Sequence, residues 1–115
     1  MEATVPLKMQ SIAVLGMLTL LFGLPLQTLA QAVEVGISDY KFQPAELKIK
    51  VGTTVKWINH EKRVSHSVLF TGPGGFESDR FFPGESWQRT FDKPGSYSYT
   101  CGPHPEMKGR IEVSE

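Results

Sequence analysis

A group of side chains with metal-binding chemistry stands near the carboxyl end of the chain. Cys101, His104 and Met107 are three residues apart, so a tight loop could direct a thiol, an imidazole and a thioether to one centre. Pro103 and Pro105 stiffen that loop and reduce the entropy that is lost when the donors are held in place. Thiolate and thioether are soft donors that suit Cu(I), whereas imidazole also suits Cu(II). The combination predicts a site for one copper ion.

A second imidazole must come from elsewhere, because a copper site of this kind typically uses two histidines, one cysteine and a weak axial methionine. The two remaining histidines are His60 and His66. His66 directly precedes the apolar residues 68–70, whose backbone could fix its ring. His60 stands beside the charged residues 61–63, a run typical of a solvated turn. We therefore expect His66 to complete the set and His60 to be an exposed loop residue.

The composition excludes several classes to which the protein could belong. The 115 residues include 12 basic and 12 acidic side chains, which give a formal charge of zero. Nucleic-acid-binding domains usually carry clustered Lys and Arg, so this balance argues against that class. The single cysteine excludes an internal disulfide, a structural zinc site with several thiolates and an iron–sulfur cluster. The length predicts one globular domain.

The amino-terminal part of the chain has the features of a targeting segment. Residues 12–26 are almost entirely apolar, but the run is shorter than the roughly 20 residues that cross a bilayer as a helix. Lys8 precedes the run, and two small-residue triplets that end at Ala30 and Ala32 follow it. We expect residues 1–32 to be a secretory signal peptide cleaved after Ala32. Cleavage after Ala30 and an uncleaved anchoring helix are the alternatives.

Export of residues 33–115, with the periplasm as the expected compartment, would expose a free thiol to oxidising conditions. Such a thiol tends to be oxidised or paired with another. Cys101 must therefore be buried, joined to another chain or bound to a metal.

The expected mature chain is predicted to form short strands. Apolar residues alternate with other residues at 33–37, 47–57, 87–91 and 97–101, which is the period of half-buried strands. Gly52-Thr53 interrupts the second segment and predicts a hairpin there, and the Gly- and Pro-rich residues 71–84 predict a long loop. We expect an all-β fold, a two-sheet Greek-key β-sandwich of about seven to eight short strands.

The alternation of side chains between the two faces of a strand also predicts the position of the thiol. Tyr97, Tyr99 and Cys101 share one face of a strand, and that face is expected to point toward the interior. The thiol should thus lie at the end of a strand, directed inward, immediately before the loop that carries His104 and Met107.

These motifs resemble those of a known family. Trp57-Ile58-Asn59, His66 and the pattern Cys101-x-x-His104-x-x-Met107 are similar to the cupredoxins, specifically the amicyanin and plastocyanin group, over essentially all of residues 33–115. The short spacers on each side of His104 are similar to the ligand loop of amicyanin. Further residues that fit the family pattern are Phe82-Pro83-Gly84-Glu85-Ser86-Trp87, Phe91, Pro94-Gly95-Ser96-Tyr97 and Tyr99.

The resemblance implies a type 1 copper bound by His66, Cys101, His104 and Met107. It also implies one-electron transfer between redox partners outside the cytoplasm, with Cu(II) and Cu(I) as the two states. In the family, the imidazole that matches His104 reaches the surface within an apolar patch where partners dock. A monomer that is not inserted in the membrane is expected after signal cleavage.

Three residues depart from the family pattern. Ser65 and Ser67 stand where the family often has Pro and Asn around its first His ligand. The backbone N–H of Ser67 could still donate to the Cys101 sulfur, but loss of the Asn side chain changes the hydrogen bonding around the ligands. Glu106 stands where amicyanin has a bulky apolar residue, so the docking patch is expected to be more polar.

The predicted ligand set bears on the function of the protein. If four protein ligands fill the site, no position is left for a substrate, which favours an electron carrier over an enzyme. The main alternative is a copper-binding module for delivery or storage, although such proteins often carry Met-rich or His-rich tracts that this sequence lacks. A sandwich domain without metal would leave the spacing of Cys101, His104 and Met107 unexplained.

Overall fold

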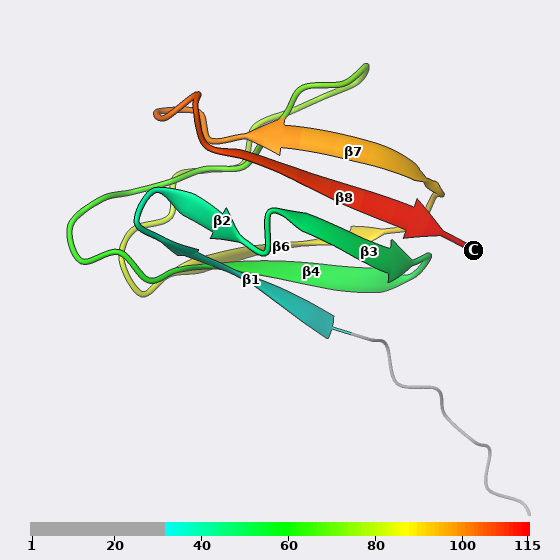
Figure 1. Cartoon of the computed structure of the whole chain (residues 1–115), viewed down its shortest axis with the longest axis horizontal. Coiled ribbons are helices and arrows are strands. Elements are labelled where there is room, and N and C mark those ends of the chain that lie inside the picture. Colours follow the sequence, from blue (N-terminus) through cyan, green and yellow to red (C-terminus); the bar gives the residue numbers. More distant parts are fainter. Residues whose placement is uncertain (1–31) are drawn as a thin grey trace, which may run out of the picture.

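The computed structural model describes residues 32–115, which form two four-stranded β-sheets packed face to face (Figure 1). The first sheet has the strand order β2-β1-β4-β6 and the second has the order β3-β8-β7-β5. The expected all-β sandwich is confirmed. The strands are β1 (Ala32–Ser38), β2 (Lys41–Gln43), β3 (Glu46–Lys50), β4 (Thr53–Asn59), β5 (Leu69–Phe70), β6 (Ser86–Phe91), β7 (Gly95–Thr100) and β8 (Lys108–Ser114).

Both sheets are mixed. β1 pairs with β4 in parallel and β3 pairs with β8 in parallel, whereas the remaining pairs are antiparallel. The expected signal segment, residues 1–32, lies outside the described residues except for Ala32, the first residue of β1. None of the described residues forms a helix long and apolar enough to cross a bilayer.

The predicted hairpin at Gly52-Thr53 is wrong. β3 and β4 follow one another in the sequence, but β3 pairs with β8 whereas β4 pairs with β1 and β6. Gly52 has a φ of 92°, a left-handed conformation that glycine adopts readily, and this turn carries the chain from one sheet to the other. Alternating apolar residues indicate a strand with one buried face, but they do not say which strand lies beside it.

The predicted loop over residues 71–84 contains no strand, and it is anchored to the sheets by two isolated bridges. One bridge joins His66 to Phe81 and the other joins Leu69 to Glu77. The loop therefore lies against the segment that precedes and forms β5.

The core between the sheets is closed by a hydrogen bond between two aromatic side chains. Trp57 of β4 donates its Nε1–H to the hydroxyl of Tyr99 on β7 at 3.2 Å, and both side chains are almost completely buried. Burial raises the pKa of Tyr99 to about 12, although the bond from Trp57 acts in the opposite direction. Gly109 lies opposite Tyr99 on β8, and a Cβ there would overlap the phenol ring. The two sheets are thus fixed relative to each other beside the strand that leads to Cys101.

A cation lies among aromatic rings at the β5–β6 side of the sandwich. The guanidinium carbon of Arg89 on β6 is 4.5 Å from the ring centroid of Phe70 and 4.7 Å from that of Phe91. Phe76 and Tyr97 are slightly farther away, at 5.2 and 5.3 Å. Cation–π attraction and burial of the side-chain stem favour this arrangement.

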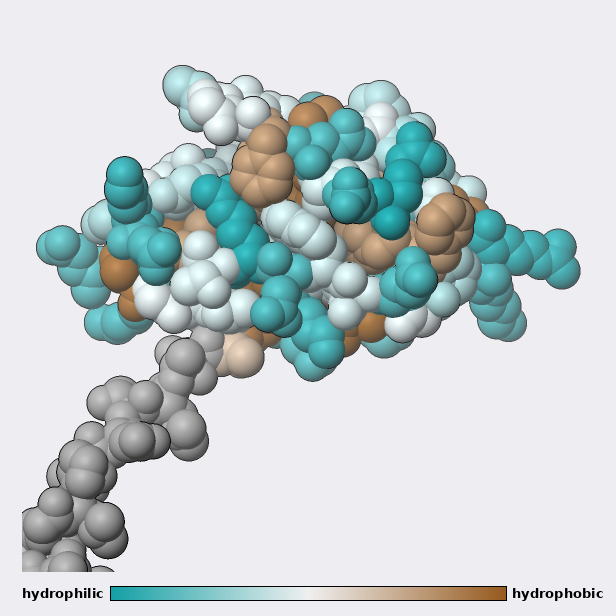
Figure 2. Space-filling model, turned by 180° about the vertical axis from the view of Figure 1, so that it is seen from behind, coloured by the Kyte–Doolittle hydropathy of each residue, from teal (hydrophilic) through white to brown (hydrophobic). Residues whose placement is uncertain are grey.

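On the face shown in Figure 2, apolar side chains are separated by hydrophilic ones. Large continuous apolar patches mark sites of association with other molecules. The described residues on this face therefore do not form such a patch.

We expect the Arg89→Ala substitution to lower the free energy of unfolding by about 1–2 kcal/mol, because the aromatic rings lose both the cation and the packing of its stem. Arg89→Lys should retain part of this energy. Urea denaturation measures both, with Gln88→Ala on the exposed side of the same strand as the control. Equal losses for Arg89→Ala and Gln88→Ala would contradict a role for the aromatic surroundings.

Candidate metal centre

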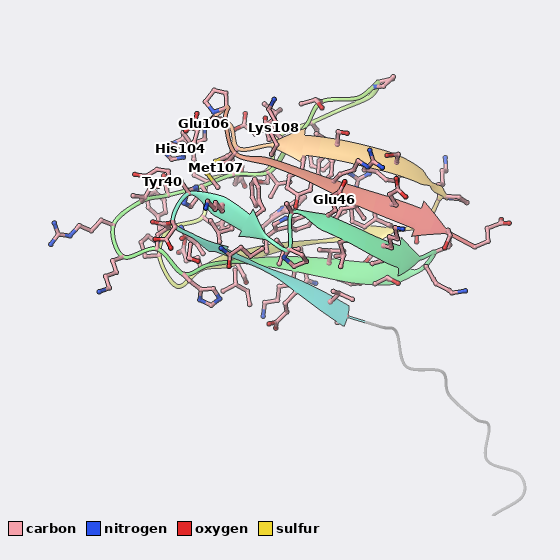
Figure 3. All side chains as sticks on the ribbon, in the orientation of Figure 1. Tyr40, Glu46, His104, Glu106, Met107 and Lys108 are labelled. Atoms are coloured by element: carbon pink, nitrogen blue, oxygen red, sulfur yellow. The ribbon has the colours of Figure 1, made fainter. Side chains whose placement is uncertain are left out.

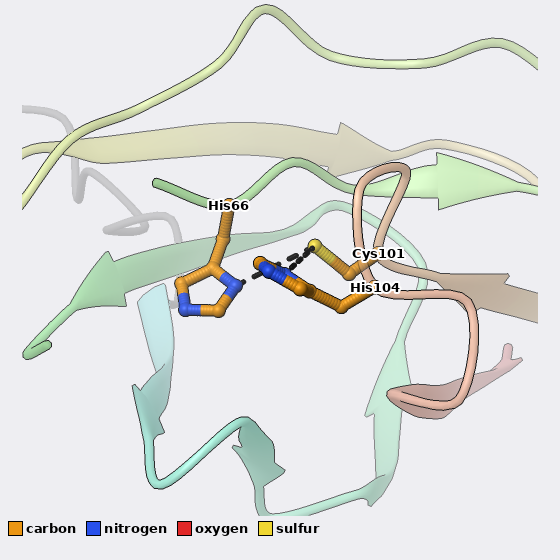
Figure 4. Close-up of side chains that lie close together, drawn as sticks. All are labelled: His66, Cys101 and His104. Carbon is orange, nitrogen blue, oxygen red and sulfur yellow. Dashed lines mark hydrogen bonds between the residues drawn. The ribbon is translucent and has the colours of Figure 1, made fainter. Parts of the chain in front are cut away.

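Three of the predicted donor side chains meet at one end of the sandwich (Figure 4). The Cys101 Sγ lies 3.5 Å from the His66 Nδ1 and 3.6 Å from the His104 Nδ1. The three donor atoms all lie within 4.8 Å of one another. His66 and Cys101 are completely buried, whereas His104 is partly exposed. The structure therefore brings together residues that are far apart in the sequence.

Backbone hydrogen bonds shape the loop between β7 and β8. The Cys101 N–H donates to the Met107 carbonyl at 3.1 Å, which closes the loop. Within it, the His104 N–H donates to the Cys101 carbonyl at 3.3 Å and the Met107 N–H donates to the His104 carbonyl at 3.0 Å. Each bond joins two of the predicted donors, so the three-residue spacing becomes a sequence of tight turns. As predicted, the thiol lies just after a strand, is buried and precedes this loop.

Met107 is 2% exposed and lies at the end of the loop, next to β8. Figure 3 shows Met107 and His104 at the same end of the molecule, together with Tyr40. The thioether is thus carried by the same closed loop as Cys101 and His104.

His66 is held by a different part of the chain. Its backbone N–H donates to the Phe81 carbonyl at 3.1 Å, and the Phe81 N–H donates back to the His66 carbonyl at 3.0 Å. The Asn59 side chain at the end of β4 donates to the carbonyls of Val64 and Phe81 at 2.8 and 3.1 Å. These bonds fix both segments that flank the imidazole. His60 is exposed and lies outside the donor group, with its ring beside Gly36.

The surroundings of the thiol favour its protonated form when no metal is bound. Burial raises the pKa of Cys101, although hydrogen bonds from Ser67 and from the His104 backbone lower it. The Ser67 N–H lies 3.4 Å from the sulfur, as the sequence predicted. Burial lowers the pKa of His66, and so does the positive charge of His104 when it is protonated. A neutral imidazole is the form that binds a metal.

The donor geometry fits a transition-metal ion. Metal–nitrogen and metal–sulfur bonds of about 2.0 and 2.3 Å would separate the donors of a trigonal site by about 3.5–3.8 Å. The distances of 3.5 and 3.6 Å from the Cys101 sulfur to the two Nδ1 atoms agree with this spacing. One soft thiolate with two imidazoles, and a thioether on the same loop as the thiolate, is a donor set that suits copper.

Sequence analysis missed the carboxylate beside His66. Glu61 was assigned to a solvated turn, but its side chain is 12% exposed and its Oε1 lies 3.9 Å from the His66 Nε2. That Nε2 is buried without a hydrogen-bond partner among the described residues. The same Glu61 oxygen accepts a bond from the Tyr40 N–H at 3.0 Å. A carboxylate near the outer nitrogen of a ligating imidazole can orient the ring. No sequence pattern distinguished Glu61 from its charged neighbours.

Tyr40 is a second residue that sequence analysis missed. Its ring lies edge-on to that of His104, with 4.9 Å between centroids and an angle of 89°. Its backbone has a φ of 56°, and that of Asp39 has a φ of 53°, so both adopt a left-handed turn between β1 and β2. The side chain remains 45% exposed. Tyr40 therefore forms part of the surface directly beside His104.

Comparisons with known proteins agree with the donor set. Residues 29–114 match the sequence profile of the family described as copper binding proteins, plastocyanin/azurin family. The chain is 40% identical over 88 residues to amicyanin-alpha of Methylorubrum extorquens, an alignment that covers 73% of this chain and 73% of that protein. The Cu(I) form of an amicyanin mutant has a TM-score of 0.70 at 32% identity, covering 76% of this chain and 87% of that chain.

A larger protein contains a similar unit. A copper-containing nitrite reductase from Thermus scotoductus has a TM-score of 0.68 at 36% identity to this chain. The match covers 78% of this chain but only 23% of the reductase. The likeness therefore concerns one part of that enzyme.

In copper-free protein, we expect the free energy of unfolding to fall as the pH rises above about 8.5, the ordinary pKa of a thiol. The pKa of Cys101 is raised in the folded state, so the folded chain binds more protons than the unfolded chain in this range. Stability then decreases with rising pH. Tyr99, with a pKa of about 12, adds a change of the same sign only above its ordinary value of about 10.

Denaturation of the copper-free domain from about pH 7 to about pH 10 measures this effect. The Cys101→Ala variant is the control, because it keeps Tyr99 and removes the thiol. A variant with the same pH dependence as the wild type would show that Cys101 does not cause the change.

Proposed function

This chain belongs to the plastocyanin/azurin family of copper-binding proteins, and on this basis we propose that it carries single electrons between redox partners. The observation that supports the proposal is the position of the buried Cys101 thiol between the Nδ1 atoms of His66 and His104. Bound copper would supply the one-electron couple between Cu(II) and Cu(I). We assign His66, Cys101, His104 and Met107 as the ligands of a type 1 site.

The contribution of the protein is to hold these donors in nearly fixed positions. His66 is fixed by reciprocal backbone bonds with Phe81, and the other donors by the closure between Cys101 and Met107. The deeply buried positions of His66, Cys101 and Met107 exclude water. A site that changes little between two oxidation states loses little energy to rearrangement during electron transfer.

A carrier is favoured over an enzyme by the number of protein donors. Catalytic metal sites usually keep an open coordination position for water or substrate. The four proposed ligands would leave none, and this chain corresponds to a small part of the nitrite reductase that it resembles. Copper delivery or storage remains the competing function, and the experiment below separates the two.

Partners are proposed to dock around His104. This imidazole is partly exposed, and the exposed ring of Tyr40 packs against its edge. Pro103 is half-buried and Pro105 is exposed, and both flank His104 in the sequence. Glu106 is also exposed there, which adds a negative charge to the docking face. The charge favours partners that present a basic or polar group opposite the loop.

We expect Cys101→Ser to abolish the intense blue absorption of the copper-loaded protein, because the thiolate is the source of the charge-transfer band. Met107→Gln should still bind copper, but its reduction potential should shift because the axial ligand changes. Visible and electron paramagnetic resonance spectra after addition of Cu(II) measure the first effect, and voltammetry measures the second.

His60→Ala is the matched control, since His60 lies outside the donor group. A wild-type protein that gives a pale Cu(II) species with ordinary hyperfine splitting would contradict the type 1 assignment. That result would favour delivery or storage instead.

Export is proposed for the chain on the basis of its amino-terminal sequence. β1 begins at Ala32, so cleavage after Ala32 would remove one residue of the strand and cleavage after Ala30 would leave it whole. We expect expression of residues 1–115 in a Gram-negative bacterium to give a periplasmic product that begins at Val33. Mass spectrometry distinguishes this product from one that begins at Gln31. An unprocessed chain in the membrane fraction would contradict the signal-peptide assignment.

A further inference from the structure

Glu77 lies over the metal-binding loop although it belongs to the distant segment between β5 and β6. Its Oε2 accepts a hydrogen bond from the hydroxyl of Ser67 at 2.7 Å. A Cβ on Gly102, the residue after Cys101, would overlap the Glu77 carboxylate. The carboxylate therefore packs against the loop at the position where the loop leaves the thiol.

Ser67 connects this carboxylate to the metal-binding loop. Its side chain is completely buried, and its Oγ accepts a bond from the Gly102 N–H at 3.0 Å. An ionised carboxylate only accepts hydrogen bonds and a backbone N–H only donates them, so the direction of both bonds is determined. They run from the Gly102 N–H to the Ser67 hydroxyl and from that hydroxyl to Glu77. The negative charge of the Glu77 carboxylate polarises these two hydrogen bonds and strengthens both of them.

The backbone on each side keeps Glu77 in place. Glu77 forms an isolated bridge with Leu69, and the Ser78 N–H donates to the Val68 carbonyl at 2.9 Å. The Ser78 hydroxyl accepts a bond from the Val68 N–H, also at 2.9 Å. Glu77 as a residue is exposed to solvent, but its backbone is bound to the segment that follows His66.

Ser67 also contacts the thiol directly. Its backbone N–H donates to the Cys101 Sγ at 3.4 Å, while its side chain holds Gly102. One residue thus fixes both the sulfur and the peptide that follows it. The Asn that the family often has at this position is absent here, and the side chain of Ser67 bonds to Glu77.

From these contacts we propose that Glu77 is a positioning residue of the metal centre that acts through Ser67. It orders the peptide of Gly102 and thereby limits the movement of Cys101. Its negative charge also favours the more positive, oxidised state of the centre and lowers the reduction potential. This second effect rests on the proposed copper function, whereas the ordering effect does not.

Copper-free protein tests the ordering. Hydrogen exchange of the Gly102 amide, followed by NMR, should be about tenfold faster in Glu77→Ala than in the wild type, which corresponds to about 1.4 kcal/mol. Glu77→Gln should exchange more slowly than Glu77→Ala, because the amide oxygen can still accept the Ser67 bond. Asp79→Asn is the matched control, an exposed acidic residue in the same loop. Gly102 exchange that is the same in Glu77→Ala and Asp79→Asn would overturn the proposal.

Copper-loaded protein tests the charge. Glu77→Gln should keep the thiolate absorption band and raise the reduction potential, and the difference from the wild type should decrease at high salt because Glu77 is an exposed residue. Glu77→Ala should raise the potential and also alter the band. A potential in Glu77→Gln equal to that of Asp79→Asn would overturn the charge effect. If the wild type itself shows no thiolate band, the copper function fails, and the Gly102 exchange still decides the ordering effect.

Discussion

The position of the Cys101 sulfur relative to His66 depends first on the pairing of β5 with β7 in the second sheet. Leu69 of β5 lies opposite Thr100 of β7, so the residues that follow His66 run beside the end of β7, next to Cys101. His66 is also paired with Phe81, in the segment that precedes β6 of the first sheet. The hydrogen bond between Trp57 and Tyr99 crosses the interface between the two sheets two residues before the thiol. A change in the separation of the sheets would therefore strain the pairing of His66 with Phe81. The large aromatic core serves the metal centre by keeping that separation constant.

The sequence contained enough information for the general architecture and for the group of donors. Alternating residues predicted the strands, and the apolar stretch after His66 distinguished this histidine from His60. The same alternation did not predict that the chain changes sheets at Gly52, because a strand partner is chosen by packing across the whole domain. The alternation of residues predicts which face of a strand is buried, but it does not predict which strands pair with that strand.

Residues that act on the donors from outside were harder to predict. Glu61, Tyr40 and Glu77 all lie in turns or loops, and their neighbours at the centre are distant in the sequence. A turn between β1 and β2 and a loop after β5 bring two of them to the centre. Such contacts follow from the closure of backbone segments after folding. These contacts cannot be inferred from the spacing of residue types along the sequence.

The placement of three donors on one short loop also affects how a metal contributes to folding. Cys101, His104 and Met107 are close together in any conformation of the chain, so an unfolded chain can already offer them to a metal ion. A metal that binds the unfolded state stabilises the native state by less than its full affinity. His66 is different, because only the folded backbone brings it to the sulfur. Metal binding is therefore coupled to folding mainly through His66, because this imidazole is available to the metal only in the folded state.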